Sequence, residues 1–252
     1  MKKEARCSEI LNMLATTKAV TSTELSKYFH VTEETIRKDL FYLSEKGQII
    51  RTFGGATLKE NVEQSLEQRI VRNYRQKMKI AYEVAKLIKP RDLIVIDAGS
   101  TSMLLAKMIQ PNSDVIVITN SLENINILAN IEGITVVGTG GTLSNKSMSF
   151  RGILAEKAIS SYNLQKAFIS CAAVDAQRGI MDTSEQEVRV KLRMIDETEE
   201  VYLLADSSKF NRIAHVTVCD FSRITAIITD DEIDLETVEK FKHIGVNIII
   251  AT

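Results

Sequence analysis

The stretch that decides the fold is Asp92-Leu93-Ile94-Val95-Ile96-Asp97-Ala98-Gly99-Ser100-Thr101. Its apolar, β-branched centre is too short for a buried helix, so it predicts a strand covered on both faces, as in a parallel sheet. Asp97 stands at the carboxyl end of this strand, and the small residues 98–101 turn the chain into an apolar helix. Glycine lets a ligand approach the backbone, hydroxyls can donate to it, and the start of a helix favours an anion. The stretch fits a ligand-binding turn and an ordinary strand-to-helix turn capped by Ser or Thr equally well.

Strand-like and helix-like segments alternate along most of the chain. Buried strands are predicted at 93–97, 115–119, 134–138, 167–170, 201–205, 226–229 and 246–250. Amphipathic helices are predicted before and between them, at 77–88, 101–109, 122–130, 184–197 and 235–243. Because alternation at this spacing requires crossover connections, it predicts an α/β domain with a mostly parallel, open, doubly wound sheet.

Polar side chains follow five of the predicted strands, and ligands bind at this edge of open α/β sheets. We expect Asp97 and Asp175 to accept hydrogen bonds from ligand hydroxyls. We expect Ser100, Thr101 and Lys209 to hold a phosphate. The candidate effector-binding residues are Asp97, Gly99, Ser100, Thr101, Asn120, Ser121, Gly140, Gly141, Asp175 and Lys209.

Each of these fragments alone has a simpler structural interpretation. Asn120 can cap a helix, Gly140-Gly141 can form a turn, and Lys209 can be a solvated loop residue. Their coincidence at one edge favours a pocket for a ligand with several hydroxyls and one anionic group. Arg189 and Lys191, on the helix at 184–197, are further candidates for the phosphate, although a solvated face is more common for such side chains.

Composition bounds the class of protein. With 252 residues, 44% of them hydrophobic, the chain is long enough for two domains with buried cores. Its formal net charge of -1 gives no global signature for nucleic acid, so such a site must be local. The three cysteines are scattered and the three histidines lie far apart, so neither a disulfide framework nor a metal site is expected. No apolar run approaches the ~20 residues of a membrane span and no signal-peptide core follows the N-terminus, so we expect a cytoplasmic protein without a membrane partner or a cofactor.

The first sixty residues have the pattern of a helix-turn-helix. A leading helix is predicted over 5–16, and Thr21-Ser22-Thr23-Glu24 is a capping box that opens a second, short helix. Thr32 can cap a third helix that runs to about Lys46, with Ile36, Leu40 and Leu43 on its inner face. Two helices joined by so short a turn form a helix-turn-helix, and we assign residues 1–57 to it.

The outward positions of the third helix are candidates for DNA contact. Arg and Lys can donate to guanine, and Thr can meet a base edge or a phosphate. Residues 48–52 and the turn at 53–56 predict a strand and a glycine wing. The candidate DNA-binding residues are Thr32, Thr35, Arg37, Lys38, Tyr42, Arg51, Gly54 and Gly55. Residues 1–60 carry ten Lys and Arg against eight Asp and Glu, a modest excess, so a protein-interaction module is the alternative.

The run Val31-Thr32-Glu33-Glu34-Thr35-Ile36-Arg37-Lys38-Asp39-Leu40 is followed by Leu43, Gly47, Ile50-Arg51 and Gly54-Gly55. Together they resemble the winged helix-turn-helix signature of the DeoR-type family of bacterial sugar-metabolism repressors. The resemblance implies that helix 32–46 is the recognition helix, and that Thr35, Arg37, Lys38 and the wing at 51–55 meet operator DNA.

The resemblance continues through the strand ends. Asp97-Ala98-Gly99-Ser100-Thr101, Thr119-Asn120-Ser121, Gly140-Gly141-Thr142, Leu204-Ala205-Asp206-Ser207-Ser208-Lys209-Phe210 and Ile228-Thr229-Asp230 are similar to the effector-domain signatures of this family. It implies a sensor domain over residues 77–252 with a fold like that of phosphosugar isomerases. Residues 58–76, rich in charged and amide side chains, are predicted to be a linker.

The same resemblance implies the function. It points to a repressor of a carbohydrate-utilisation operon that responds to a phosphorylated sugar or sugar alcohol. The residues of these motifs are similar to those of glucitol (sorbitol) operon repressors. Two operator half-sites imply a homo-oligomer, a dimer or a tetramer. The chain departs from the family at Cys171-Ala172-Ala173-Val174-Asp175, where a glycine pair is usual, and the two methyl groups are expected to narrow the pocket.

The likeness to isomerases raises an alternative, a phosphosugar isomerase that carries an accessory helix-turn-helix. Isomerisation needs a general base, and Asp97, Asp175 or Glu185 would be the candidates. Nothing in the sequence pairs an acid with a base, and fold similarity does not carry activity with it. We therefore expect a sensor without catalytic residues.

Overall fold

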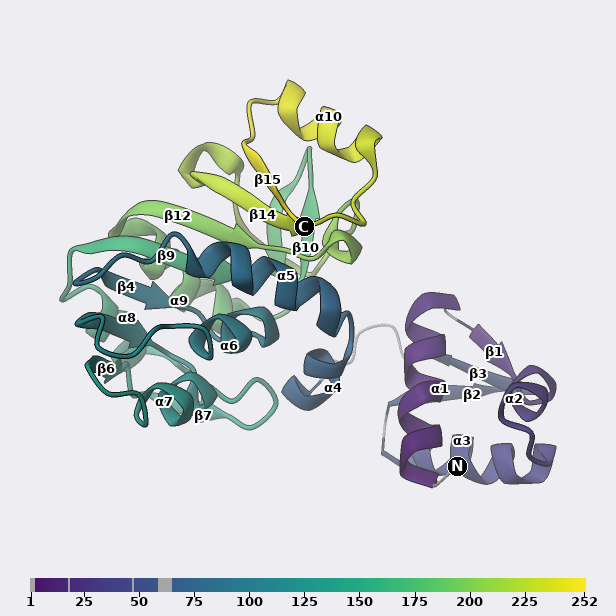
Figure 1. Cartoon of the computed structure of the whole chain (residues 1–252). Helices are drawn as coiled ribbons and strands as arrows, with labels where there is room; N and C mark the ends of the chain where they lie inside the picture. The colour runs from purple at the N-terminus through teal and green to yellow at the C-terminus, as the bar shows by residue number, and fades with distance from the viewer. Residues whose placement is uncertain (1–2, 18, 47, 59–64) are drawn as a thin grey trace. The chain divides into compact units, whose positions relative to one another are not determined.

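The computed structural model describes residues 3–17, 19–46, 48–58 and 65–252, which fall in two compact units, Met1–Gln64 and Ser65–Thr252 (Figure 1). Gly47 of the family-like signature and residues 59–64 of the predicted linker lie outside the described residues.

The N-terminal unit is a winged helix-turn-helix, as predicted. Its helices are α1 (Lys3–Thr17), α2 (Ser22–Phe29) and α3 (Glu33–Glu45). Its antiparallel sheet has the order β1-β3-β2, from β1 (Ala19–Thr21), β2 (Ile49–Thr52) and β3 (Gly55–Leu58). The short strand β1 was not predicted, because three residues are too few for a periodic pattern.

Local capping explains where the helices of this unit begin and end. The Thr21 hydroxyl accepts a hydrogen bond from the Glu24 amide at 3.1 Å, and the Glu24 carboxylate accepts from the Thr21 amide at 2.9 Å, which confirms the capping box. His30 ends α2 in the left-handed conformation. The inner faces meet in a core that includes the fully buried Ile10, Leu25 and Ile36.

The C-terminal unit contains a seven-stranded, wholly parallel sheet with the order β15-β14-β12-β9-β4-β5-β6. The strands are β4 (Leu93–Ile96), β5 (Val115–Thr119), β6 (Ile134–Gly138), β9 (Leu164–Ser170), β12 (Thr198–Leu204), β14 (Ala226–Asp230) and β15 (Ile248–Ala251). The chain adds β5 and β6 on one side of β4, and then adds β9, β12, β14 and β15 on the other side of β4. The strand order therefore reverses between β4 and β9, and this confirms the predicted open parallel sheet.

Helices cover both faces of this sheet, and α5 and α6 lie in front of it in Figure 1. The helices are α5 (Tyr74–Ala85), α6 (Ser100–Ala106), α7 (Leu122–Leu128), α8 (Ile153–Ile159), α9 (Glu185–Asp196) and α10 (Leu235–His243). Ile94 and Ile96 pack into one core with α5, α6 and α7, whereas Val95 packs into the other with α8, α9 and α10. A continuous apolar strand is thus explained, since both of its faces are buried.

Several small elements were not predicted. They are α8, the hairpin of β7 (Thr142–Ser144) and β8 (Ser149–Arg151), and a three-stranded sheet of β10 (Ala173–Asp175), β11 (Gly179–Asp182) and β13 (Val216–Cys219). All of these strands have three or four residues, so their sequences show no clear alternation.

The predicted linker at 58–76 is too long at its C-terminal end. Residues 65–76 belong to the compact C-terminal unit, where they form α4 (Leu66–Val71) and the start of α5. Ser65 and Gln68 form a capping box at the start of α4. Leu66 is buried and Ile70 packs against the core, so two apolar side chains and a cap order a segment that its composition predicted to be a linker.

None of the described helices is long and apolar enough to cross a membrane. Within the described ranges, no group of three or more His, Cys, Asp or Glu side chains is placed to hold a metal ion.

Candidate functional site

The start of α3 carries the two threonines predicted to meet DNA. The Thr32 hydroxyl accepts a hydrogen bond from the Thr35 amide at 3.3 Å, and the two hydroxyls lie 2.9 Å apart. Thr32 therefore caps the helix and orients Thr35, which leaves the remaining hydrogen-bonding capacity of both hydroxyls at the exposed end of α3.

Arg37 and Lys38 project from the exposed face of α3. Arg37 Nη2 lies 3.4 Å from Glu33 Oε2, and Lys38 Nζ lies 3.1 Å from Glu34 Oε1. Both cations and Glu34 are largely exposed and Glu33 is 40% exposed, and exposed pairs of this kind contribute only about 0.3–0.5 kcal/mol. Both cations are thus free to exchange their carboxylate partners for phosphates or base edges.

Further cations and aromatic rings surround this helix. The Tyr42 ring has Lys3 Nζ at 4.1 Å and Lys46 Nζ at 5.7 Å from its centroid. Arg51 lies over the Phe41 ring, 5.8 Å from its centroid. These rings hold the long cationic side chains against the exposed face of α3.

The wing turns at Phe53-Gly54, between β2 and β3. Gly54 has φ +91°, which favours glycine, and a Cβ on Gly55 would lie 2.0 Å from the Val20 carbonyl oxygen. Phe53, which the sequence reasoning did not select, is fully exposed at this turn. The signal was present in the sequence, since a large apolar residue at a turn has no core to enter.

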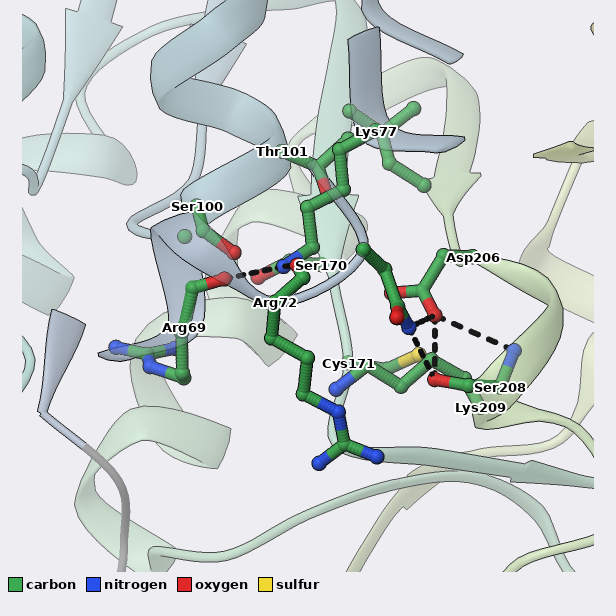
Figure 2. A pocket seen from close by; sticks show the side chains of 13 residues that line it. Arg69, Arg72, Lys77, Ser100, Thr101, Ser170, Cys171, Asp206, Ser208 and Lys209 are labelled. Carbon is green, nitrogen blue, oxygen red and sulfur yellow. Dashed lines mark hydrogen bonds between the residues drawn. The ribbon is translucent and has the colours of Figure 1, made fainter. Parts of the chain in front are cut away.

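The second candidate site is a pocket at the carboxyl ends of β4, β9 and β12, next to the reversal of strand order (Figure 2). It encloses about 450 Å³, including space open to solvent. Its lining consists of Arg69, Arg72, Asn73, Lys77, Gly99, Ser100, Thr101, Ser170, Cys171, Leu204, Asp206, Ser208 and Lys209. A reversal of strand order leaves a crevice outside the strand ends, which is where open α/β sheets bind ligands.

Cationic side chains dominate this pocket. Arg69, Arg72, Lys77 and Lys209 line it, against the single carboxylate of Asp206. Burial would raise the pKa of Asp206, but Lys209 and the hydrogen bond from Ser208 outweigh it and lower that pKa. Burial also lowers the pKa of Arg72, and nearby Arg212 adds to the effect. The excess of positive charge favours an anionic ligand.

Hydroxyls at the ends of β4 and β9 supply the neutral part of the lining. Ser100 and Thr101 begin α6, and Ser170 ends β9. A Cβ on Gly99 would lie 2.7 Å from Ser170 Oγ, so glycine is needed for the close approach of the two strand ends. Gly99, Ser100, Thr101 and Lys209, all selected from the sequence, are among the residues that line the pocket, and their contact with a ligand stays a prediction.

Asp97 does not line this pocket. Its carboxylate is buried and accepts hydrogen bonds from the Ser170 amide at 3.0 Å, from Ser170 Oγ at 2.8 Å and from Lys191 Nζ. The expectation that Asp97 receives ligand hydroxyls finds no support in this pocket, because Asp97 lies outside the lining and three protein donors converge on its Oδ2. Lys191 is likewise committed to Asp97, and Arg189 pairs with Glu185 on the exposed face of α9.

Five other predicted residues also lie outside the pocket lining, namely Asn120, Ser121, Gly140, Gly141 and Asp175. Asn120 Nδ2 donates to the Phe150 carbonyl at 3.4 Å, and Ser121 caps α7. Asp175 Oδ1 accepts from two turn amides, those of Gln177 and Arg178, at 3.0 Å each.

The two glycines precede β7, and both have positive φ. All five residues outside the lining thus have ordinary structural roles, in helix caps, in turns or in a hydrogen bond to a backbone carbonyl. Ala172 and Ala173 are absent from the lining, so the expected narrowing by their methyl groups is not seen.

The sequence reasoning missed Arg69, Arg72, Asn73, Lys77 and Ser170. Four of them lie in or beside the segment assigned as a linker. The available signal was the density of basic residues just before the first strand, which resembles a solvated face as much as a binding site.

Two family profiles match the chain. The DeoR-like helix-turn-helix domain matches residues 6–62, and the DeoR C terminal sensor domain matches residues 72–231. Among solved structures, ribose 5-phosphate isomerase A from Methanocaldococcus jannaschii is similar over 55% of each chain, with 20% sequence identity and a TM-score of 0.39.

Relatives are similar over most of their length. YulB of Bacillus subtilis (strain 168), described as an uncharacterized HTH-type transcriptional regulator, is 36% identical over 94% of this chain and 91% of its own. The L-fucose operon activator of Haemophilus influenzae is 33% identical over 82% of this chain and 84% of its own. The HTH-type transcriptional repressor GlcR of B. subtilis is 32% identical over 91% and 89%, respectively. The chain belongs to the DeoR family of DNA-binding transcriptional regulators, and it is not an enzyme.

Proposed function

We propose that the protein is a repressor of a carbohydrate-utilisation operon, and that a phosphorylated sugar or sugar alcohol in the pocket changes its affinity for operator DNA. The observation that carries this proposal is the pocket at the ends of β4, β9 and β12, where four cations and several hydroxyls meet. Arg and Lys bind phosphate by charge-assisted hydrogen bonds, and the polar groups of the lining suit sugar hydroxyls.

The relatives support the sugar and leave the direction of regulation to experiment. One is named for an L-fucose operon and is an activator, whereas GlcR is a repressor. We assign repression as the working mode. DNA lies in the bacterial cytoplasm, so we place the protein there.

The DNA-binding part of the proposal assigns Thr35, Arg37 and Lys38 to the operator, with Thr32 as the cap that orients Thr35. Tyr42, Arg51 and the wing glycines Gly54 and Gly55 complete the surface. A pair of half-sites requires at least two copies of this unit, so we propose a homodimer or a tetramer.

The proposal is tested first by thermal unfolding of the full chain with a panel of phosphorylated pentoses, hexoses and hexitols. A ligand that binds only the folded protein stabilises it by about 2.7 kcal/mol at one hundred times its Kd, which raises Tm by several degrees. The effect of a hit should be lost in Lys209→Ala and kept in Lys240→Ala, an exposed lysine on α10.

A hit is then titrated against labelled upstream DNA by fluorescence anisotropy. Release of DNA by the ligand supports repression that the sugar relieves, and tighter binding points to activation. A panel that leaves Tm unchanged, or a hit that Lys209→Ala does not affect, would contradict the assignment of the pocket. Steep loss of DNA affinity with salt separates DNA binding from a protein-interaction role.

A further inference from the structure

Four of the residues that line the pocket come from one short segment, residues 65–77, which comprises α4 and the start of α5. The N-terminal unit ends at Gln64, so this segment is the first part of the sensor unit that the chain enters after the DNA-binding unit. Figure 2 shows Arg69 and Ser100 on one side of the pocket and Asp206 and Ser208 on the other.

Lys77 holds the C-terminal end of α4. Its side chain is buried, and Nζ donates to the carbonyl oxygen of Arg72 at 2.6 Å and to that of Arg69. Arg69 lies in the last turn of α4 and Arg72 is its C-cap residue, and carbonyls at the end of a helix lack partners within it. The ammonium group of Lys77 therefore determines how this turn lies against the pocket.

The guanidinium group of Arg69 is poorly satisfied. Its Nε and Nη2 atoms are buried and have no hydrogen-bond partner among the described residues. A buried donor without a hydrogen-bond partner destabilises the folded protein, and more so when it is charged. An arginine in this position is explained if its task is to meet an anion.

Asn73 ties the segment to the opposite wall. It has φ +52°, and its Nδ2 donates to Asp206 Oδ1 at 2.8 Å and to Ser208 Oγ at 2.9 Å. Asp206 and Ser208 belong to the loop after β12, next to Lys209. The segment is thus anchored at Asn73, while its three lining cations and Lys209 share one carboxylate in the pocket lining, that of Asp206.

We propose that residues 65–77 form an anion-dependent latch, in which the ligand's phosphate is bound jointly by Arg69 and Arg72 of the segment and by Ser100 and Lys209 of the strand ends. The latch rests on the proposed function, namely that the pocket binds the phosphate of the effector. It adds that ligand binding orders the segment that leads into the DNA-binding unit. The sensor then acts through α4, because α4 is the part of the site nearest in sequence to that unit.

The latch implies that anion binding is linked to a proton. Burial lowers the pKa of Lys77 to about 7, an effect that Asp206 opposes and that Lys209, Arg69 and Arg72 reinforce. A dianion beside these cations stabilises charged Lys77 and so raises its pKa. Cys171 also lines the pocket and is ionisable, but burial raises its pKa to about 12, so it does not titrate near neutrality. Dianion binding therefore takes up a proton above pH 7.

The test uses the full chain with sodium sulfate as a dianion of constant charge, against sodium chloride at equal ionic strength. Hydrogen exchange is followed by mass spectrometry in peptides from residues 65–77, 98–103 and 204–210. We expect sulfate to protect all three in the wild type. In Arg69→Gln and Arg72→Gln, protection of 65–77 should be lost, whereas Arg75→Gln, an exposed neighbour on α5, should behave as the wild type.

The outcomes separate the two proposals. If sulfate protects 98–103 and 204–210 of the wild type from exchange but does not protect 65–77, the latch is overturned and the assignment of the pocket stands. No protection anywhere, or protection that persists in Lys209→Gln, would overturn the pocket and the latch with it.

The proton linkage gives an independent measurement. Sulfate affinity, taken from the shift in Tm, should fall by up to about tenfold per pH unit above pH 7. Lys77→Arg keeps a cation that does not titrate, so its affinity should stay constant between pH 6.5 and 8.5. A wild-type affinity that does not change over this range, or a Lys77→Arg variant with the same pH dependence as the wild type, would contradict the role of Lys77.

Discussion

Lys191 of α9 and Asp97 at the end of β4 form an ion pair in the interior of the sensor unit, where their side chains are 3% and 4% exposed. Asp182 lies 3.5 Å from Lys191 Nζ. Burial alone would lower the pKa of Lys191, but Asp97 and Asp182 outweigh it and raise the pKa well above its usual value. Asp97 also accepts hydrogen bonds from Ser170, a pocket residue, so its carboxylate links the ends of β4 and β9 to α9.

Replacement of Lys191 should therefore destabilise the sensor unit. Lys191→Met leaves the buried Asp97 and the half-buried Asp182 without their cation, and removing one partner of a buried pair costs about 3–5 kcal/mol. Urea unfolding measures this loss. Arg189→Met, which breaks an exposed pair on the same helix, should cost less than about 1 kcal/mol. Equal effects of the two substitutions would show that the buried pair has no special role.

The lowered pKa of Asp206 predicts a loss of stability in acid. A carboxyl group whose pKa is lower in the folded than in the unfolded state stabilises the protein above its unfolded pKa, near 3.9, and this contribution disappears as pH falls through the folded value. Asp206→Asn should thus be less stable than the wild type at pH 7. The difference should shrink below about pH 4, as measured by urea unfolding across pH 2.5–7. A constant difference would contradict the linkage, and Glu236→Gln on the exposed face of α10 is the control.

Arg37 should contribute to sequence recognition. Its exposed pair with Glu33 is weak enough to be exchanged for DNA contacts. Arg37→Ala should reduce discrimination between operator and unrelated DNA by about 1–3 kcal/mol, roughly 5- to 150-fold, in anisotropy titrations at fixed salt. Lys86→Ala, on the sensor unit, should leave this ratio intact. Unchanged selectivity in Arg37→Ala would contradict the assignment of α3 as the recognition helix.

The two wing glycines should differ in their tolerance of alanine. Gly55→Ala would force a Cβ to within 2.0 Å of the Val20 carbonyl oxygen, so β1 and β3 must move apart. Gly54→Ala meets open space and carries only the strain of its positive φ, about 1–2 kcal/mol. Hydrogen exchange in β1 and β3 should therefore rise more in Gly55→Ala than in Gly54→Ala. The reverse order would show that the strands separate easily here.

Local pattern was sufficient for the larger elements. The predicted bounds of β5, β6 and α10 agree with the structure, because an apolar run of five residues or a helical period over nine residues is decided by its own sequence. The capping box at Thr21 and the cap at Thr32 were likewise predicted correctly, since each involves residues only three positions apart.

Membership of the pocket could not be predicted in the same way. The end of β4 lies between the ends of β5 and β9, so Gly99 lies close to Ser170. Asp97 binds Lys191, which is 94 residues away in the sequence. The polar groups after β5 and β6 lie on the other side of β4 and outside the pocket lining. The segment at 65–77 joins the pocket for the same reason, because Asn73 finds its partners 133 and 135 residues away. Spacing along the chain determines helices, strands and caps, whereas the order of strands in a sheet is decided by the burial of whole faces, which exists only in the folded structure.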